Sequence, residues 1–170
     1  TVGIRLVEGL IARGVDTVFG IPGVHTIELY RGLSAAGNQI RHVTPRHEQG
    51  ACFMADGYAR VSGKPGVAFV ITGPGVTNSL TAMAQAKADS VPMLVISSCL
   101  NAADLGIGRG RLHEMKGQEA AAAAVCGWSR TALDAASAYG LIDQALLEFA
   151  TGRPGARHIQ VPISVLGART

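Results

Sequence analysis

The chain has 170 residues, a length typical of one domain, and 48% of them are hydrophobic, which is enough for a sizeable core. Only 16% are charged, a low share for a surface fully exposed to water, so we expect one face to be covered by another domain or subunit. The net charge of +3 comes from scattered basic residues without an aromatic-interleaved stripe, and no signal peptide or bilayer-length apolar run is present, which argues against nucleic-acid binding and membrane insertion.

Helical and extended patterns alternate from the start of the chain. Residues 3–14 carry apolar side chains at helical spacing, with Gly14 suited to a C-cap, and residues 17–19 predict a short strand that enters a Gly/Pro turn. The next expected elements are a helix over 25–36, a short strand over 39–45 and a helix from His47 to about Gly63.

Two continuous apolar runs follow, at 66–72 and 92–98. Such runs are typical of strands buried on both faces of a parallel sheet, and the segment between them predicts a helix over about 76–89. Beyond them we expect a loop over 99–118, helices over 119–126 and 134–151, and a last strand over 158–163. The alternation predicts an α/β fold: a doubly wound parallel β-sheet with helices on both faces.

In sheets of this kind, ligands collect at the carboxyl ends of the strands. Three turns expected there are rich in Gly, Pro and polar residues: 20–25, 44–48 and 72–78. In the third, GPGVTNS (73–79) follows a buried strand and opens a helix, so its backbone N–H groups suit an anion or a polar ligand. It is neither a Walker A loop nor GxGxxG, and by itself it also fits a simple tight turn.

The helix that begins near His47 opens with a carboxylate, Glu48. This residue shares one stripe of the helix with small residues (Cys52, Ala55 and Ala59), whereas the opposite stripe suits water (Gln49, Asp56 and Arg60). A carboxylate on a packed stripe is costly to bury unless something pairs with it. The simpler alternative is a helix N-terminal charge that the helix dipole favours.

The remaining candidates for chemistry are ambiguous when they are taken singly. His25, His42 and His47 each fit a structural role as well as a ligand role. GRGR, with Arg109 and Arg111, fits a solvated loop as well as a functional one. Three cysteines, odd in number and far apart, match neither a zinc site nor a disulfide framework, so we expect reduced core thiols in a cytoplasmic protein (Cys52, Cys99 and Cys126).

Three stretches together resemble the acetolactate synthase-like family of thiamine-diphosphate (ThDP) enzymes. They are DTVFGIPG at 16–23, RHEQGACFMADGYARVSGKPGVAFVITGPGVTNSLTAMAQAKADSVPMLVIS at 46–97, and RLHE at 111–114. The resemblance covers nearly the whole chain, and it implies that residues 1–170 are the N-terminal domain that holds the cofactor's aminopyrimidine ring. Since the chain also begins at Thr1 rather than Met, we expect a fragment of a larger three-domain enzyme.

The resemblance assigns roles to individual residues. It implies that Glu48 exchanges a proton with N1′ of the pyrimidine, which activates C2 of the thiazolium toward a 2-oxo acid. The cofactor-binding residues that it implies are Glu48, Pro22, Gly23, Thr72, Gly73 and Asn78. It places no metal ligand in this chain, because Mg²⁺ and the diphosphate are held by the enzyme's C-terminal domain.

Two positions depart from acetolactate synthase. His113 stands where those enzymes usually have Gln, and His25 stands where they usually have a small residue. Benzaldehyde lyase-like enzymes place a His at the second position, facing the substrate, so we count His25 and His113 with Glu48 as catalytic candidates. RGRLHE also resembles 2-oxo acid decarboxylases that act on guanidino substrates.

The sequence therefore leaves several functions open. The leading hypothesis is an acetolactate synthase-like domain of an enzyme that decarboxylates or ligates 2-oxo acids. The alternatives are a specific decarboxylase, for example of 5-guanidino-2-oxopentanoate, a benzaldehyde lyase-like carboligase, and a non-catalytic binding or oligomerisation domain. The expected partner is the diphosphate-binding domain of a second subunit in a homodimer or homotetramer; FAD in a middle domain is left open, and the isolated domain is expected to be inactive.

Overall fold

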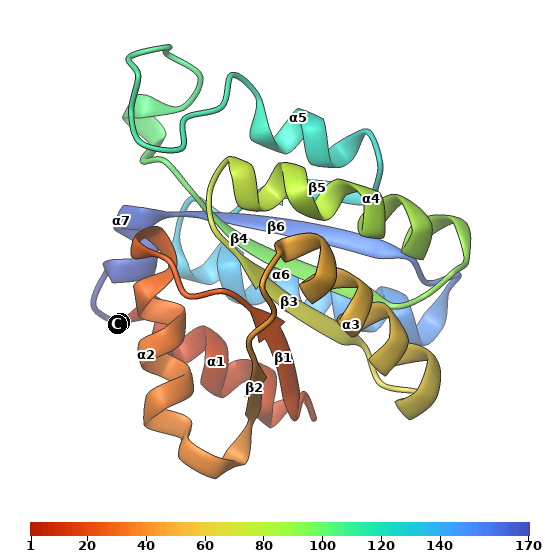
Figure 1. Cartoon of the computed structure of the whole chain (residues 1–170). Coiled ribbons are helices and arrows are strands. Elements are labelled where there is room, and N and C mark those ends of the chain that lie inside the picture. Colours follow the sequence, from red (N-terminus) through yellow and green to blue (C-terminus); the bar gives the residue numbers. More distant parts are fainter.

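The computed structural model describes residues 1–170, and its strands form one sheet. The sheet has six parallel strands in the order β2-β1-β3-β4-β6-β5 (Figure 1). The strands are β1 (Thr17–Gly20), β2 (Arg41–Val43), β3 (Gly66–Val70), β4 (Met93–Cys99), β5 (Trp128–Thr131) and β6 (Ala156–Pro162). The order reverses direction along the chain after β2, which is the doubly wound arrangement that the alternating pattern predicts.

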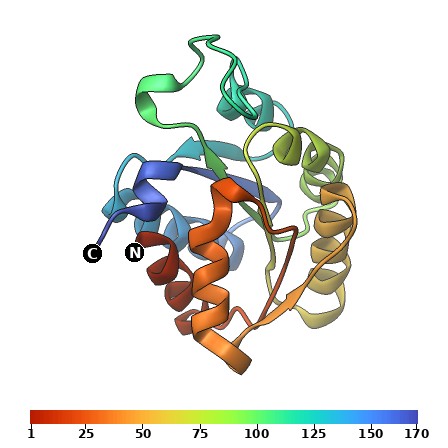
Figure 2. The same cartoon turned by 60° about the vertical axis from the view of Figure 1, so that its left-hand side comes forward.

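Helices cover both faces of this sheet. They are α1 (Val2–Ala12), α2 (Ile27–Ala36), α3 (Glu48–Ser62), α4 (Pro74–Ala88), α5 (Gln118–Ala123), α6 (Ala135–Thr151) and α7 (Ile163–Gly167). One core cluster joins α1, α2, α6 and α7 to one face, and a second joins α3, α4 and α5 to the other. Figure 2, turned by 60°, shows the sheet between these two helix layers.

Local sequence explains where the helices at the carboxyl edge of the sheet begin and end. His47 caps α3, since its Nδ1 accepts a hydrogen bond from the Gln49 N–H at 3.1 Å, and Gly63 ends the helix in the left-handed region at φ 71°. Pro74 stands in the first turn of α4, where a missing N–H costs nothing. These caps fix the start of α3 and of α4 at the same edge of the sheet (Figure 1).

The predicted α/β architecture is confirmed, and two short elements were missed. β5 lies at the sheet edge, and its alternating burial gives WSRT no continuous apolar run. α7 directly follows β6, and its five residues are too few to show a helical period. In addition, the predicted strand over 39–45 shrinks to Arg41–Val43.

The prediction that Asp56 faces water is wrong. Its exposed fraction is 6%, and its Oδ1 lies 2.5 Å from Arg60 Nε one helical turn later. The guanidinium supplies the charge that lets the carboxylate be buried, so only Arg60 reaches solvent. The small-residue stripe of Cys52, Ala55 and Ala59 is buried as predicted.

Candidate functional site

The three polar turns meet at the carboxyl edge of the sheet. The turn after β1 continues into a short 3₁₀ helix, η1 (Val24–Thr26), the turn before α3 ends at Glu48, and the turn after β3 opens α4. Hydrogen bonds connect the last two turns through Glu48 and the first to the third through His25. The expectation that these segments share one site is therefore consistent with the contacts.

Glu48 is held by Asn78 from the first turns of α4. The Asn78 amide Nδ2 donates to Glu48 Oε2 at 2.9 Å, while Oε1 makes no hydrogen bond within the chain. The carboxylate is half-buried rather than sequestered, and it stands on the first residue of α3, where the helix dipole favours negative charge. The arrangement leaves one carboxylate oxygen available to a ligand.

Thr72 joins the two histidines that depart from the acetolactate synthase pattern. His25 Nδ1 lies 3.0 Å from the Thr72 hydroxyl, and His113 Nδ1 lies 3.2 Å from the Thr72 carbonyl oxygen. Because a carbonyl can only accept, His113 carries its proton on Nδ1 and leaves Nε2 free. The two rings stand edge to face with centroids 5.5 Å apart.

The surroundings of His25 change its pKa. Burial lowers the pKa of His25 below its usual 6.5, and the neighbouring charge of His113 lowers it further. A lowered pKa keeps the His25 ring neutral at neutral pH, so one ring nitrogen can donate a hydrogen bond and the other can accept one.

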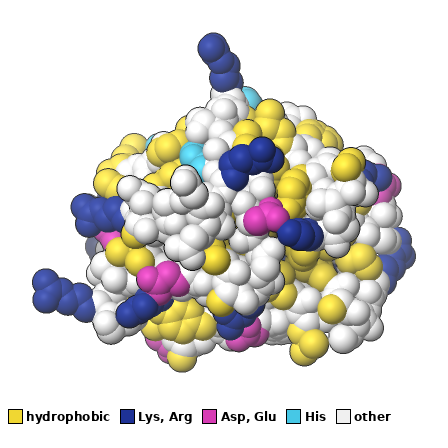
Figure 3. Space-filling model, turned by 90° about the horizontal axis from the view of Figure 1, so that it is seen from below, with side chains coloured by type: hydrophobic (Ala, Val, Ile, Leu, Met, Phe, Trp, Pro, Cys, Tyr) yellow, Lys and Arg dark blue, Asp and Glu magenta, His cyan; other side chains and the backbone are white.

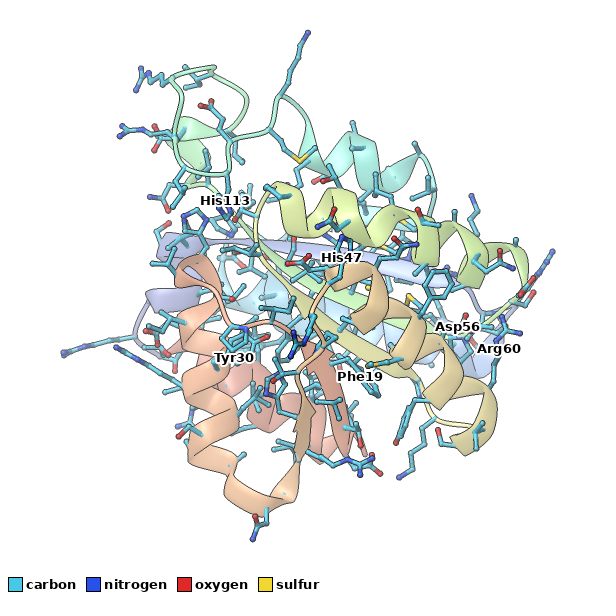
Figure 4. All side chains as sticks on the ribbon, viewed as in Figure 1. Phe19, Tyr30, His47, Asp56, Arg60 and His113 are labelled. Carbon is cyan, nitrogen blue, oxygen red and sulfur yellow. The ribbon has the colours of Figure 1, made fainter.

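The loop that carries His113 docks on Gly73. A Cβ on Gly73 would lie 2.3 Å from the His113 carbonyl oxygen, and Gly73 itself has a φ of 69°. Any other residue would meet both a clash and backbone strain there. Figure 4 shows His113 reaching from this loop toward the start of α2, with His47 at the start of α3.

A buried hydrogen-bond network connects the turn after β3 to the ends of the neighbouring strands and to α5. The Thr72 hydroxyl donates to Ser98 Oγ at 2.9 Å, and the Gly73 N–H donates to Gln118 Oε1 at 2.7 Å. Gln118 in turn donates to the Ser98 carbonyl and to Gln160 Oε1. Because buried polar groups that are fully paired rigidify their surroundings, this network fixes the position of Thr72 and Gly73.

The other predicted residues are placed as follows. Pro22 is exposed on the turn after β1, and Gly23 lies against Ile71, whose Cδ1 would be 2.5 Å from a Cβ there. His42 Nε2 lies 2.9 Å from the Gly20 carbonyl oxygen, which fits its structural alternative, and His47 is the cap of α3.

Sequence reasoning missed Ser98, Gln118 and Glu114. A serine at the end of the apolar run 92–98 was a signal for a polar end of that strand, but Gln118 has no local signal at all. The three thiols are free and buried, as predicted, and burial raises the pKa of Cys52 and of Cys99 to about 12, so neither is a nucleophile at neutral pH.

Known proteins are similar to this chain over most of its length. Residues 1–125 match the family model described as "Thiamine pyrophosphate enzyme, N-terminal TPP binding domain", TPP being another name for ThDP. The "Probable 2-ketoarginine decarboxylase AruI" of Pseudomonas aeruginosa is 60% identical over 99% of this chain and 30% of its own length.

Two acetolactate synthases are also similar. "Acetolactate synthase, chloroplastic" of Arabidopsis thaliana is 37% identical over 92% of the chain, and the "Acetolactate synthase large subunit" of Parasynechococcus marenigrum is 36% identical over 94%. The chain spans less than a third of the length of these curated relatives, at 30%, 23% and 26%. The chain belongs to the thiamine pyrophosphate enzymes, as their N-terminal TPP-binding domain.

Proposed function

We propose that residues 1–170 are the pyrimidine-binding domain of a larger, three-domain enzyme that uses ThDP to decarboxylate a 2-oxo acid. The observation that carries this proposal is the Glu48 carboxylate, which Asn78 holds through one oxygen at the edge where His25 and His113 meet. A carboxylate fixed at one oxygen and free at the other suits the exchange of a proton with a ring nitrogen.

The donor set of the site fits the cofactor. When bound, ThDP would supply a nucleophilic carbon for the substrate carbonyl. Glu48 would hold the proton for a nitrogen of the pyrimidine, and Asn78 keeps the carboxylate in place. Pro22 and Gly23 would line the pyrimidine on one side, and Thr72 and Gly73, which are hydrogen-bonded to Ser98 and Gln118, would line it on the other.

His25 and His113 are proposed to face the substrate. Thr72 orients both rings, and His113 offers Nε2 as a proton acceptor. An imidazole that faces the substrate can give a proton to a developing oxyanion and take it back, which suits the decarboxylation of a 2-oxo acid.

2-Ketoarginine (5-guanidino-2-oxopentanoate) is the proposed substrate. The Pseudomonas relative that is named as a probable 2-ketoarginine decarboxylase is 60% identical over nearly the whole domain, whereas the Arabidopsis acetolactate synthase is 37% identical. Acetolactate synthesis remains the second candidate, because the Glu48 and Asn78 arrangement serves either reaction.

The remainder of the assembly is proposed from the family. Mg²⁺ and the diphosphate are bound by the diphosphate-binding domain of a second subunit, in a homodimer or homotetramer.

None of the helices combines the length and the hydropathy that a bilayer-spanning helix needs.

A screen of 2-oxo acids with the full-length protein tests the proposal. 2-Ketoarginine and pyruvate are compared with ThDP and Mg²⁺ present, and CO₂ release and coupled products are followed separately. We expect CO₂ release that is fastest with 2-ketoarginine and that requires ThDP. Acetolactate formed from pyruvate would favour the second candidate, products joined at an aldehyde would indicate a carboligase, and no ThDP-dependent turnover would leave only a binding role.

A further inference from the structure

The loop between β4 and α5 is organised by one carboxylate, Glu114. Its Oε1 accepts hydrogen bonds from the Gly108 N–H at 2.6 Å and the Arg109 N–H at 3.2 Å, and its Oε2 accepts from the Arg111 N–H at 2.9 Å. These donors lower the pKa of Glu114 below its usual 4.5, so the group is charged at neutral pH. One side chain thus closes the segment 108–114 into a ring.

The backbone of this loop is costly to fix in one conformation, so it needs the hydrogen bonds of the Glu114 carboxylate. Gly106, Gly108 and Gly110 all have positive φ, at 69°, 76° and 68°. Glycines populate many conformations in a free chain, so fixing three of them costs more conformational entropy than fixing other residues. Successive N–H groups that converge in this way form a nest for an anion, and here the anion is Glu114.

His113 directly precedes Glu114 in the chain. It has a φ of 62°, which is rare for a residue with a side chain, and its carbonyl rests on Gly73. Its ring is anchored only by the 3.2 Å contact to the Thr72 carbonyl and by the edge contact to His25. The residue with this unusual backbone therefore lies between the segment that Glu114 closes and the contact with Gly73.

We propose that Glu114 is a positioning residue that acts through His113: by gathering the Gly108, Arg109 and Arg111 amides, it holds the His113 imidazole against Thr72 and beside His25. This inference rests on the proposed function, in which His113 faces the substrate. Glu114 itself binds neither cofactor nor substrate.

A role in general stability is the competing explanation, and the surroundings of Glu114 argue against it. The flanking residues Arg109, Gly110, Arg111 and Leu112 are exposed, and the loop projects away from both helix layers (Figure 1). The loss of Glu114 should therefore loosen the loop without unfolding the domain.

The first arm of the test uses the 170-residue chain and needs no cofactor. In Glu114→Ala, amide hydrogen exchange at positions 108, 109 and 111 should accelerate at least 10-fold, and the His113 ring signals should move toward those of a free histidine. Asp104→Asn is the matched control, because Asp104 meets the same loop only through the Arg109 and Arg111 side chains, at 3.8 and 3.5 Å. It should leave these amides and the melting temperature unchanged.

The second arm is a double-mutant cycle in the full-length enzyme. Misplacing a catalytic group by about 1 Å can cost about 100-fold in rate, so we expect Glu114→Ala to lower kcat by about 10- to 100-fold with little change in ThDP affinity. Glu114→Gln, which keeps one acceptor oxygen, should fall between. In a His113→Ala background, Glu114→Ala should cost less than about 2-fold, because the group it positions is gone.

The outcomes separate this inference from the proposed function. Equal losses from Glu114→Ala with and without His113, or unaccelerated exchange at the three amides, would overturn the positioning role and leave the proposed function standing. Normal turnover of His113→Ala would remove the substrate-facing role of His113, and this inference with it.

Discussion

His158 shows how one buried residue can make the whole domain sensitive to acid. It lies in the middle of β6, fully buried, with Nε2 2.9 Å from Ser97 Oγ and Nδ1 2.6 Å from Ser129 Oγ. One ring nitrogen accepts and the other donates, so the neutral form satisfies both serines. Burial lowers the pKa of His158 from 6.5 to about 3.

The sign of the resulting pH dependence is fixed by the unfolded chain. Between the folded value of about 3 and the unfolded value of 6.5, the unfolded state binds a proton that the folded state does not. The free energy of unfolding should therefore be unaffected by this group above pH 6.5 and should fall by about 1.4 kcal/mol per pH unit well below it.

Urea unfolding between pH 4 and pH 8 measures this contribution. His158→Gln can bond both serines without titrating, so its stability should fall less steeply in acid than that of the natural chain. His42→Gln, on the half-buried edge strand, is the control and should follow the natural chain. Parallel slopes for the natural chain and His158→Gln would show that His158 is not buried in its neutral form.

At the scale of elements, the contact between the α4 turn and the β4–α5 loop depends on Gly73. Gly73→Ala combines a left-handed φ with a Cβ that would lie 2.3 Å from the His113 carbonyl oxygen. Gly63 is the matched control: its φ is 71°, but a Cβ there meets nothing within 4 Å, and it lies outside the loop. Both variants carry about 1–2 kcal/mol of backbone strain, and only Gly73→Ala should displace the loop.

Nuclear magnetic resonance of the two variants separates strain from displacement. In Gly73→Ala the signals of His113 and Thr72 should shift together, and the hydrogen bond between them should be lost. In Gly63→Ala the melting temperature should fall slightly while the two residues keep their signals. Unchanged His113 signals in Gly73→Ala would mean that the loop does not rest on this glycine.

The sequence predicts most securely the elements that are long or that have a continuous apolar run. β3 and β4 are buried along their whole length, and α3 and α6 are long helices of 15 and 17 residues. β5 was missed because an edge strand needs no continuous apolar run, and α7 because five residues carry too little period. Asp56 was misplaced because its partner Arg60 on the same helix makes its burial tolerable.

The candidate site, too, could be predicted only in part from the sequence. The three turns could be predicted because parallel strands bring their carboxyl ends to one edge. The roles of Glu48 and Asn78 came from the family resemblance, and their hydrogen bond crosses two helices that no sequence period connects. Gln118 and Glu114 could not be found, because their importance lies in which backbone N–H groups they meet.

At the scale of the whole molecule, several apolar side chains stand on the outer side of α3. Phe53, Met54 and Val61 are exposed to 40%, 45% and 91%. Seen from below, charged side chains are spread over the surface among apolar ones without gathering in one patch (Figure 3). Exposed apolar side chains such as those on α3 are the surface that the proposed assembly would cover.

The proposed division of the cofactor site between two domains predicts how the chain behaves alone. Residues 1–170 offer the pyrimidine wall but, by the proposal, neither the diphosphate site nor Mg²⁺ ligands. Calorimetric titration of the 170-residue chain with ThDP and Mg²⁺ should give weak or no binding, because most of the ligand's charge stays unpaired. Micromolar affinity of the chain alone would contradict this division.

The most direct test of the account is hydrogen–deuterium exchange at C2 of ThDP bound to the full-length protein. Glu48→Gln keeps the shape of the side chain and can still accept from Asn78, but it cannot exchange a proton with the pyrimidine. Glu8→Gln, on the exposed face of α1, serves as the control. We predict that Glu48→Gln slows C2 exchange by about 10²- to 10⁴-fold with the fold intact, whereas exchange at the natural rate in that variant would contradict the role of Glu48.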